Sequence, residues 1–117
     1  MGLKNVLIAV ADIEKSKKFY KELFGLNVIR DFGENVILSE GLVLQCKTTW
    51  QQVLASDIIP GNSFELFFEE YDFDEFVLSV KNKGNVKLIE DVYENAWGRR
   101  CIRLCDPDGY LIEVAEK

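Results

Sequence analysis

The sequence predicts an α+β fold made of two β-α-β-β-β modules, whose strands form a curved mixed sheet (a half-barrel) with the helices outside. The main observation is an internal duplication, since the order strand, helix and three strands occurs twice. The helix-starting residues Asp12 and Asp72 lie sixty positions apart, and the helix-ending Gly25 and Gly84 lie fifty-nine apart. A length of 117 residues fits one domain, 1–117, that contains both modules.

The first module, residues 1–48, begins with a strand at 3–11, where Val and Ile alternate with other residues. Asp12 is a good helix N-cap, apolar residues recur at helical spacing after it, and Gly25 supplies the stop. Three short strands are then expected at 27–32, 35–39 and 42–47.

A linker at 49–62 breaks this pattern, with a short helical turn at 50–55 and a hinge at Pro60, Gly61 and Asn62. The second module, 63–117, repeats the first. Asp72 is expected to cap its helix, which ends before Gly84. Its strands are expected at 64–69, 86–93, 99–105 and 111–115.

Composition excludes several classes of function. A net charge of −6 and a pI near 4.7 argue against nucleic-acid binding, which needs a basic surface. Apolar runs are too short for a membrane span, and the chain start resembles no signal peptide. The absence of histidine removes Ser-His-Asp and Cys-His catalysis together with the commonest metal ligand.

The cysteines indicate the compartment. Cys46, Cys101 and Cys105 show no CxxC spacing, and the last two share a strand face but lie too far apart for a disulfide. Reduced thiols are therefore expected, which predicts a cytoplasmic protein.

Strand periodicity places polar side chains on the sheet face away from the helices. The turn Asp106-Pro107-Asp108-Gly109 starts the last strand, which presents Glu113 on one face. The same counting puts Asn5, Gln45 and Glu65 at matching positions, and the four are expected to converge on a cleft. The alternative is that Glu113 is an ordinary solvent-exposed carboxylate.

Several motifs together resemble the vicinal oxygen chelate superfamily: VADIEKSKKFY at 10–20, WGRR at 97–100, DPDG at 106–109, and Glu113. That superfamily includes glyoxalase I, extradiol dioxygenases, methylmalonyl-CoA epimerase, and fosfomycin- and bleomycin-resistance proteins. The resemblance covers nearly the whole chain and favours the histidine-free, bleomycin-resistance-like branch. It implies the fold more strongly than the activity, because the superfamily varies its chemistry on one scaffold.

The resemblance also implies where a metal would lie. Glyoxalase-like members hold a divalent metal through His and Glu, and those positions correspond here to Asn5, Gln45, Glu65 and Glu113. Only Glu113 keeps the family's residue type. Amide and carboxylate oxygens suit Mg, Ca or Mn rather than Zn, Ni or Fe, so no metal cofactor is favoured and a divalent cation is the alternative. Extradiol dioxygenase chemistry is disfavoured because its Fe(II) needs histidine.

The favoured function is binding of a small cationic or aromatic ligand in the cleft, without a transition metal. The expected lining residues are polar, aromatic and apolar: Asn5, Leu7, Gln45, Trp50, Glu65, Phe67, Trp97, Arg103, Leu111 and Glu113. Three of these have alternative roles. Trp50 and Trp97 would instead pack in the core or a dimer interface. Arg103 would neutralise Glu113 or bind an anionic ligand, or would be an ordinary exposed charge or ion pair.

Two other functions are considered. A glyoxalase-type lyase or isomerase would use Glu113 or Glu65 as the base beside a carbonyl, with a hard metal or Arg stabilising the enolate. A structural domain would instead have its cleft filled by Leu7, Phe67 and Leu111. In each case a homodimer is expected, with modules exchanged between chains through the segment 48–62 as one option.

Overall fold

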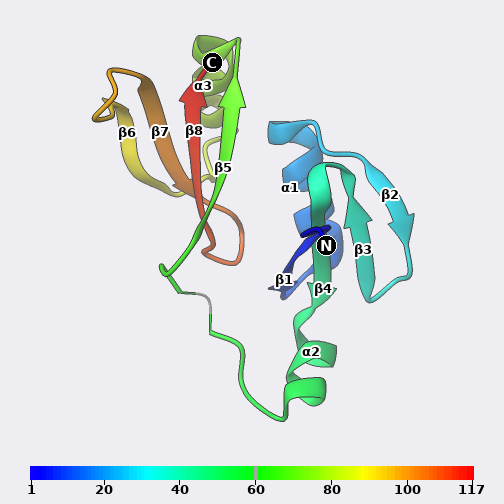
Figure 1. Cartoon of the computed structure of the whole chain (residues 1–117). Coiled ribbons are helices and arrows are strands. Elements are labelled where there is room, and N and C mark those ends of the chain that lie inside the picture. The colour runs from blue at the N-terminus through cyan, green and yellow to red at the C-terminus, as the bar shows by residue number, and fades with distance from the viewer. Residues whose placement is uncertain (60) are drawn as a thin grey trace. The chain divides into compact units, whose positions relative to one another are not determined.

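The computed structural model describes residues 1–59 and 61–117, and the chain divides into two compact units, Met1–Ile59 and Pro60–Lys117. Each unit contains a strand, a helix and three further strands in that order, as Figure 1 shows. The predicted α+β fold with two β-α-β-β-β modules is therefore confirmed. No helix within the described ranges is long and apolar enough to span a membrane.

The first unit is a four-stranded sheet with strand order β1-β4-β3-β2, in which β1 runs parallel to β4 and the other pairs are antiparallel. Its helix α1 packs against the sheet through Phe19 and Tyr20, which are buried. The elements are β1 (Val6–Val10), α1 (Ile13–Phe24), β2 (Val28–Asp31), β3 (Asn35–Leu38), the 3-10 turn η1 (Ser39–Gly41), β4 (Leu42–Cys46) and α2 (Lys47–Leu54).

The second unit repeats this topology, with strand order β5-β8-β7-β6 and β5 parallel to β8. Its core lies between α3 and one face of the sheet, where Ile102, Leu104, Ile112 and Val114 are buried. The elements are β5 (Glu65–Glu70), α3 (Phe73–Lys83), β6 (Leu88–Glu94), β7 (Arg100–Cys105) and β8 (Leu111–Glu116).

The segment between the modules differs from the prediction. A short helical turn was expected at 50–55, but an eight-residue helix, α2, begins at Lys47 and directly continues β4. It ends at Ala55, whose backbone is left-handed and donates to the carbonyls of Gln51 and Gln52. Pro60 of the predicted hinge lies outside the described residues.

The two predicted helix caps differ. The Asp12 carboxylate accepts a 3.0 Å hydrogen bond from the backbone N–H of Lys15, which confirms it as the N-cap of α1. Asp72 occupies the corresponding position of α3, but its side chain makes no capping bond, so that prediction was wrong. The Glu70 carboxylate instead accepts from the backbone N–H of Asp72 at 3.1 Å.

This difference predicts unequal effects of removing the two carboxylates. We expect Asp12→Ala to lower the free energy of unfolding by about 1 kcal/mol, because it removes a capping bond. Asp72→Ala should cost less than about 0.5 kcal/mol, since no capping bond is lost. Urea unfolding of both variants checks this, and equal losses would contradict the structural assignment.

Candidate functional site

A row of four side chains crosses the second sheet on the face opposite α3. The strand registers pair Phe67 of β5 with Glu113 of β8, Glu113 with Arg103 of β7, and Arg103 with Glu90 of β6. Residues paired in this way lie on the same face of a sheet. Glu65 and Leu111 form the next row on that face, since they are paired and lie two residues before Phe67 and Glu113.

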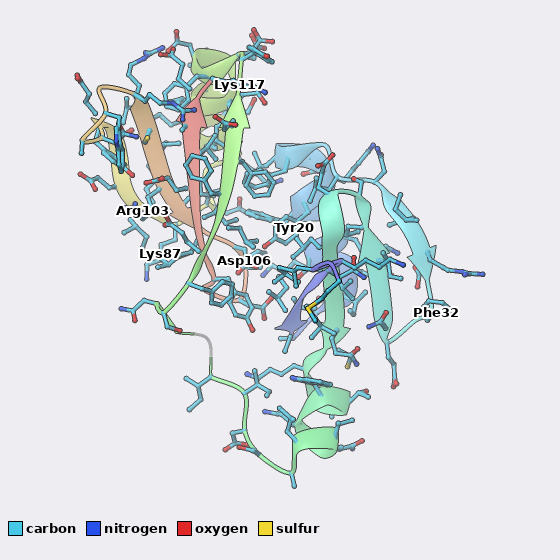
Figure 2. All side chains as sticks on the ribbon, in the orientation of Figure 1. Tyr20, Phe32, Lys87, Arg103, Asp106 and Lys117 are labelled. Atoms are coloured by element: carbon cyan, nitrogen blue, oxygen red, sulfur yellow. The ribbon has the colours of Figure 1, made fainter. Side chains whose placement is uncertain are left out.

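Arg103 is the centre of this row and binds three carboxylates (Figure 2 labels its position). One terminal nitrogen, Nη2, donates to Glu113 Oε2 at 2.5 Å, and Nε donates to Glu65 Oε2 at 3.1 Å. The other terminal nitrogen lies 3.8 Å from Glu90 Oε2. The interpretation of Arg103 as an ion-pair partner of Glu113 is therefore confirmed.

Tyr93 is a site residue that the sequence did not reveal. Its hydroxyl donates to Glu113 Oε2, and the Arg103 guanidinium carbon lies 5.4 Å from the centre of its ring. Burial, the hydrogen bond to Glu113 and the charge of Glu113 all raise the pKa of Tyr93 well above its ordinary value. The phenol therefore stays protonated as a donor. The Glu113 side chain is only 12% exposed, so the solvent-exposed alternative was wrong.

The charge of Arg103 is firmly maintained. Burial lowers the pKa of the Arg103 guanidinium, but its hydrogen bond to Glu65 and the nearby Tyr93, Glu65 and Glu113 raise it above the ordinary value overall. The guanidinium therefore stays charged.

The half of the chain that contains Arg103 is strongly acidic. Residues 60–117 hold 13 acidic and 7 basic residues, whereas residues 1–59 hold 7 of each, so the second half carries the whole net charge of −6.

Gln45 of the first unit is also engaged. Its side-chain oxygen accepts a 2.8 Å hydrogen bond from the amide of Asn35, its neighbour on β3, and the residue is only 8% exposed. Leu7 on β1 is 39% exposed, and Asn5 lies one residue before that strand.

The strand registers correct the predicted equivalence of the two polar pairs. Gln45 pairs with Ala9, four residues after Asn5, whereas Glu113 pairs with Phe67, only two residues after Glu65. At about 3.3 Å per residue, the first pair is about 7 Å farther apart along the strands than the second. The positions in the two modules therefore do not match, and the convergence of all four on one cleft stays a prediction.

Of the remaining predicted ligand contacts, two lie on the sheet face that carries Glu113, and the two tryptophans lie elsewhere. Phe67 is 51% exposed, and Leu111 is partly exposed, so both are available on the face that carries Glu113. Trp97 lies in the β6–β7 hairpin and is 84% exposed, so it is not part of the core of the second unit. Asn95 Oδ1 fixes that hairpin by accepting from the backbone N–H groups of Trp97 and Arg99. Trp50 is half-buried on α2.

The candidate metal ligands of each unit are engaged by other side chains. Glu65 and Glu113 both direct Oε2 at the Arg103 guanidinium, and the Gln45 oxygen accepts from Asn35. Throughout residues 1–59 and 61–117, no three His, Cys, Asp or Glu side chains are grouped so as to hold a metal ion. An internal cation therefore stands between the two carboxylates that a metal in this unit would use.

Comparison with known proteins identifies the family. The model of the glyoxalase-like domain matches residues 3–117. A protein of unknown function from Agrobacterium tumefaciens is 30% identical with a TM-score of 0.87, and the match covers 100% of this chain and 94% of that one.

Two other solved structures share the fold at lower identity. A glyoxalase/bleomycin resistance protein/dioxygenase family enzyme from Burkholderia phytofirmans is 22% identical, with a TM-score of 0.84 over 99% of this chain and 98% of that one. A lactoylglutathione lyase from Agrobacterium tumefaciens is 18% identical, with a TM-score of 0.76 over 98% and 92%. The chain therefore belongs to the glyoxalase-like domain family, within the vicinal oxygen chelate superfamily.

Proposed function

We propose that this protein binds a small, flat, cationic aromatic molecule on the open face of the second sheet, without a transition metal. The observation that carries the proposal is the Arg103 guanidinium between Glu65 and Glu113. Because Arg103 already neutralises the carboxylates that would serve as metal ligands, this face is suited to direct ligand contact rather than to metal coordination.

The side chains of this face support an aromatic cation as the ligand class. The Phe67 ring is half-exposed in the row that contains Glu113, and a cation stacked on such a ring gains about 0.5–2 kcal/mol. Both carboxylates use Oε2 for Arg103, which leaves Oε1 as the acceptor for donor groups of the ligand. The acidic excess of residues 60–117 adds a long-range attraction for cations.

The lyase or isomerase alternative is less well supported. It requires Glu113 or Glu65 to take a proton from the substrate. Tyr93 and Arg103 both donate to Glu113 Oε2, and Arg103 also holds Glu65 Oε2, so donors occupy one oxygen of each candidate base.

Titration of proflavine, a flat cationic dye, in the presence of EDTA tests the proposal through the fluorescence polarisation of the dye. We expect saturable binding that Phe67→Ala weakens about tenfold, the loss that corresponds to about 1.4 kcal/mol. Tyr71→Ala is the matched control, because Tyr71 is a 75% exposed aromatic residue just beyond β5. Binding that requires an added divalent metal, or equal losses in both variants, would overturn the proposal.

The quaternary structure gives a further prediction. We expect a homodimer, because one module alone makes only part of a half-barrel and the 84% exposed Trp97 is a typical interface anchor. Sedimentation equilibrium at micromolar concentration measures this, and a monomer there would contradict it.

A location in the cytoplasm is also proposed, because the three cysteines are free thiols and a reducing compartment keeps thiols in that state.

A further inference from the structure

A hollow lies in the first unit, between α1 and the beginning of β2. Its volume is about 380 Å³, which lies within the range of small-molecule sites. Its wall is formed by one carboxylate and three lysines of α1 and by three residues of the following segment: Glu14, Lys17, Lys18, Lys21, Leu26, Asn27 and Val28. None of these residues belongs to the row around Arg103.

The three ammonium groups are placed differently. Lys17 Nζ donates to Glu14 Oε1 at 3.2 Å and to Asp31 Oδ2 at 2.9 Å, and these bonds, the one to Asp31 foremost, raise the pKa of Lys17. Lys21 Nζ donates to the Asn27 side-chain oxygen, which is neutral. Lys18 Nζ lies 3.9 Å from Glu22 and its side chain is 73% exposed.

The positive charge of the hollow therefore resides mainly on Lys18 and Lys21. Glu14 and Asp31 both bond Lys17, and the acceptor of Lys21 carries no charge to offset it. Leu26 is 5% exposed and Val28 is 44% exposed, so the hollow combines a cationic wall with an apolar one.

We propose that this hollow binds a small, multiply charged anion, a phosphate monoester or a diphosphate. Ammonium groups bind phosphate oxygens as point charges, and a multiply charged anion gains most where several of them converge. The apolar wall formed by Leu26 and Val28 accommodates the organic part of a monoester. The first unit does not oppose an anion, since residues 1–59 carry no net charge. This proposal is independent of ligand binding around Phe67.

Calorimetric titration with sodium pyrophosphate at fixed ionic strength tests the proposal. We expect Lys18→Gln/Lys21→Gln to raise the Kd at least about tenfold, because it removes the two least compensated charges. The matched control is Lys4→Gln/Lys15→Gln, which removes the same charge from exposed residues of the first unit outside the hollow. That control should change the Kd less than about twofold.

Thermal unfolding gives a second measurement. Pyrophosphate at about ten times its Kd should raise the Tm of the unmodified protein by about 4 °C, and sodium chloride of equal ionic strength should not. Val28→Glu keeps every lysine but places a carboxylate in the wall of the hollow, so it should abolish the rise in Tm that pyrophosphate causes. This variant keeps the test decisive if the double lysine variant folds poorly. Equal weakening in both lysine pairs, the same shift with chloride, or a shift that survives Val28→Glu would overturn the proposal.

Discussion

Replacing Arg103 with methionine is expected to lower the free energy of unfolding by about 3 kcal/mol. The substitution leaves Glu65, Glu113 and Glu90 without their shared guanidinium, and the Glu113 side chain is only 12% exposed. Removing one partner of a largely buried ion pair costs far more than the pair itself contributes, because the remaining charge stays desolvated. Methionine keeps most of the aliphatic volume, so the loss reports the charge rather than packing.

A double-mutant cycle identifies the source of this loss. Adding Glu113→Gln to Arg103→Met should restore about 1–2 kcal/mol, since a neutral amide replaces the uncompensated carboxylate beside Tyr93. Arg30→Met is the control, because Arg30 is an exposed arginine whose guanidinium carbon lies 5.5 Å from the centre of the Phe32 ring. It should cost less than about 0.5 kcal/mol in urea unfolding. An Arg103→Met loss as small as that of Arg30→Met would show that Arg103 does not hold the site together.

The periodicity of each strand and the helix-capping residues were sufficient to predict the fold. The apolar alternation in 3–11 and the Asp12 and Gly25 signals are local, and local geometry fixes them: β1, α1 and its left-handed C-cap at Gly25 lie where the pattern indicates. The same counting identified the face of β8 that carries Glu113, because its strand pairs without a register shift with both neighbours.

The environment of Glu113 was harder to predict, for two physical reasons. Tyr93 lies on β6, whose pairing with β7 shifts register between Leu88 and Glu90 and again between Glu90 and Tyr93. Each shift breaks the two-residue period, so counting along β6 cannot assign a face to Tyr93. The mismatch of Asn5 and Gln45 has a related cause, since the register between parallel strands depends on tertiary packing and not on either strand alone.

Asp72 shows the same limit at a helix end. Aspartate favours the N-cap in general, but the backbone at Asp72 has φ −91° and ψ 57°. The Glu70 carboxylate accepts a hydrogen bond from the backbone N–H of Asp72. Without a side-chain cap, α3 depends on its buried face for stability. Phe73, Phe76, Val77 and Val80 provide that face.

Phe73→Ala is therefore expected to cost about 4 kcal/mol, the largest effect among the substitutions proposed. Phe73 is 1% exposed, and the Arg100 guanidinium carbon lies 5.1 Å from its ring centre while binding Asp74 and Glu116. Truncation to alanine loses the buried ring and leaves a cavity that the paired Arg100 is poorly placed to fill.

Leu78→Ala separates this effect from helix propensity. Leu78 lies on the same helix but is 59% exposed, so its truncation should cost less than about 1 kcal/mol, and Phe73→Leu should cost about 1–2 kcal/mol. Arg100→Ala should cost less than about 1 kcal/mol, because its ion pairs are solvent-exposed. If urea unfolding instead gave equal losses for Phe73→Ala and Leu78→Ala, intrinsic helix stability rather than the buried ring would hold α3 on the sheet. The order Phe73→Ala, Phe73→Leu, Leu78→Ala follows from burial, since the three changes remove progressively less buried apolar surface.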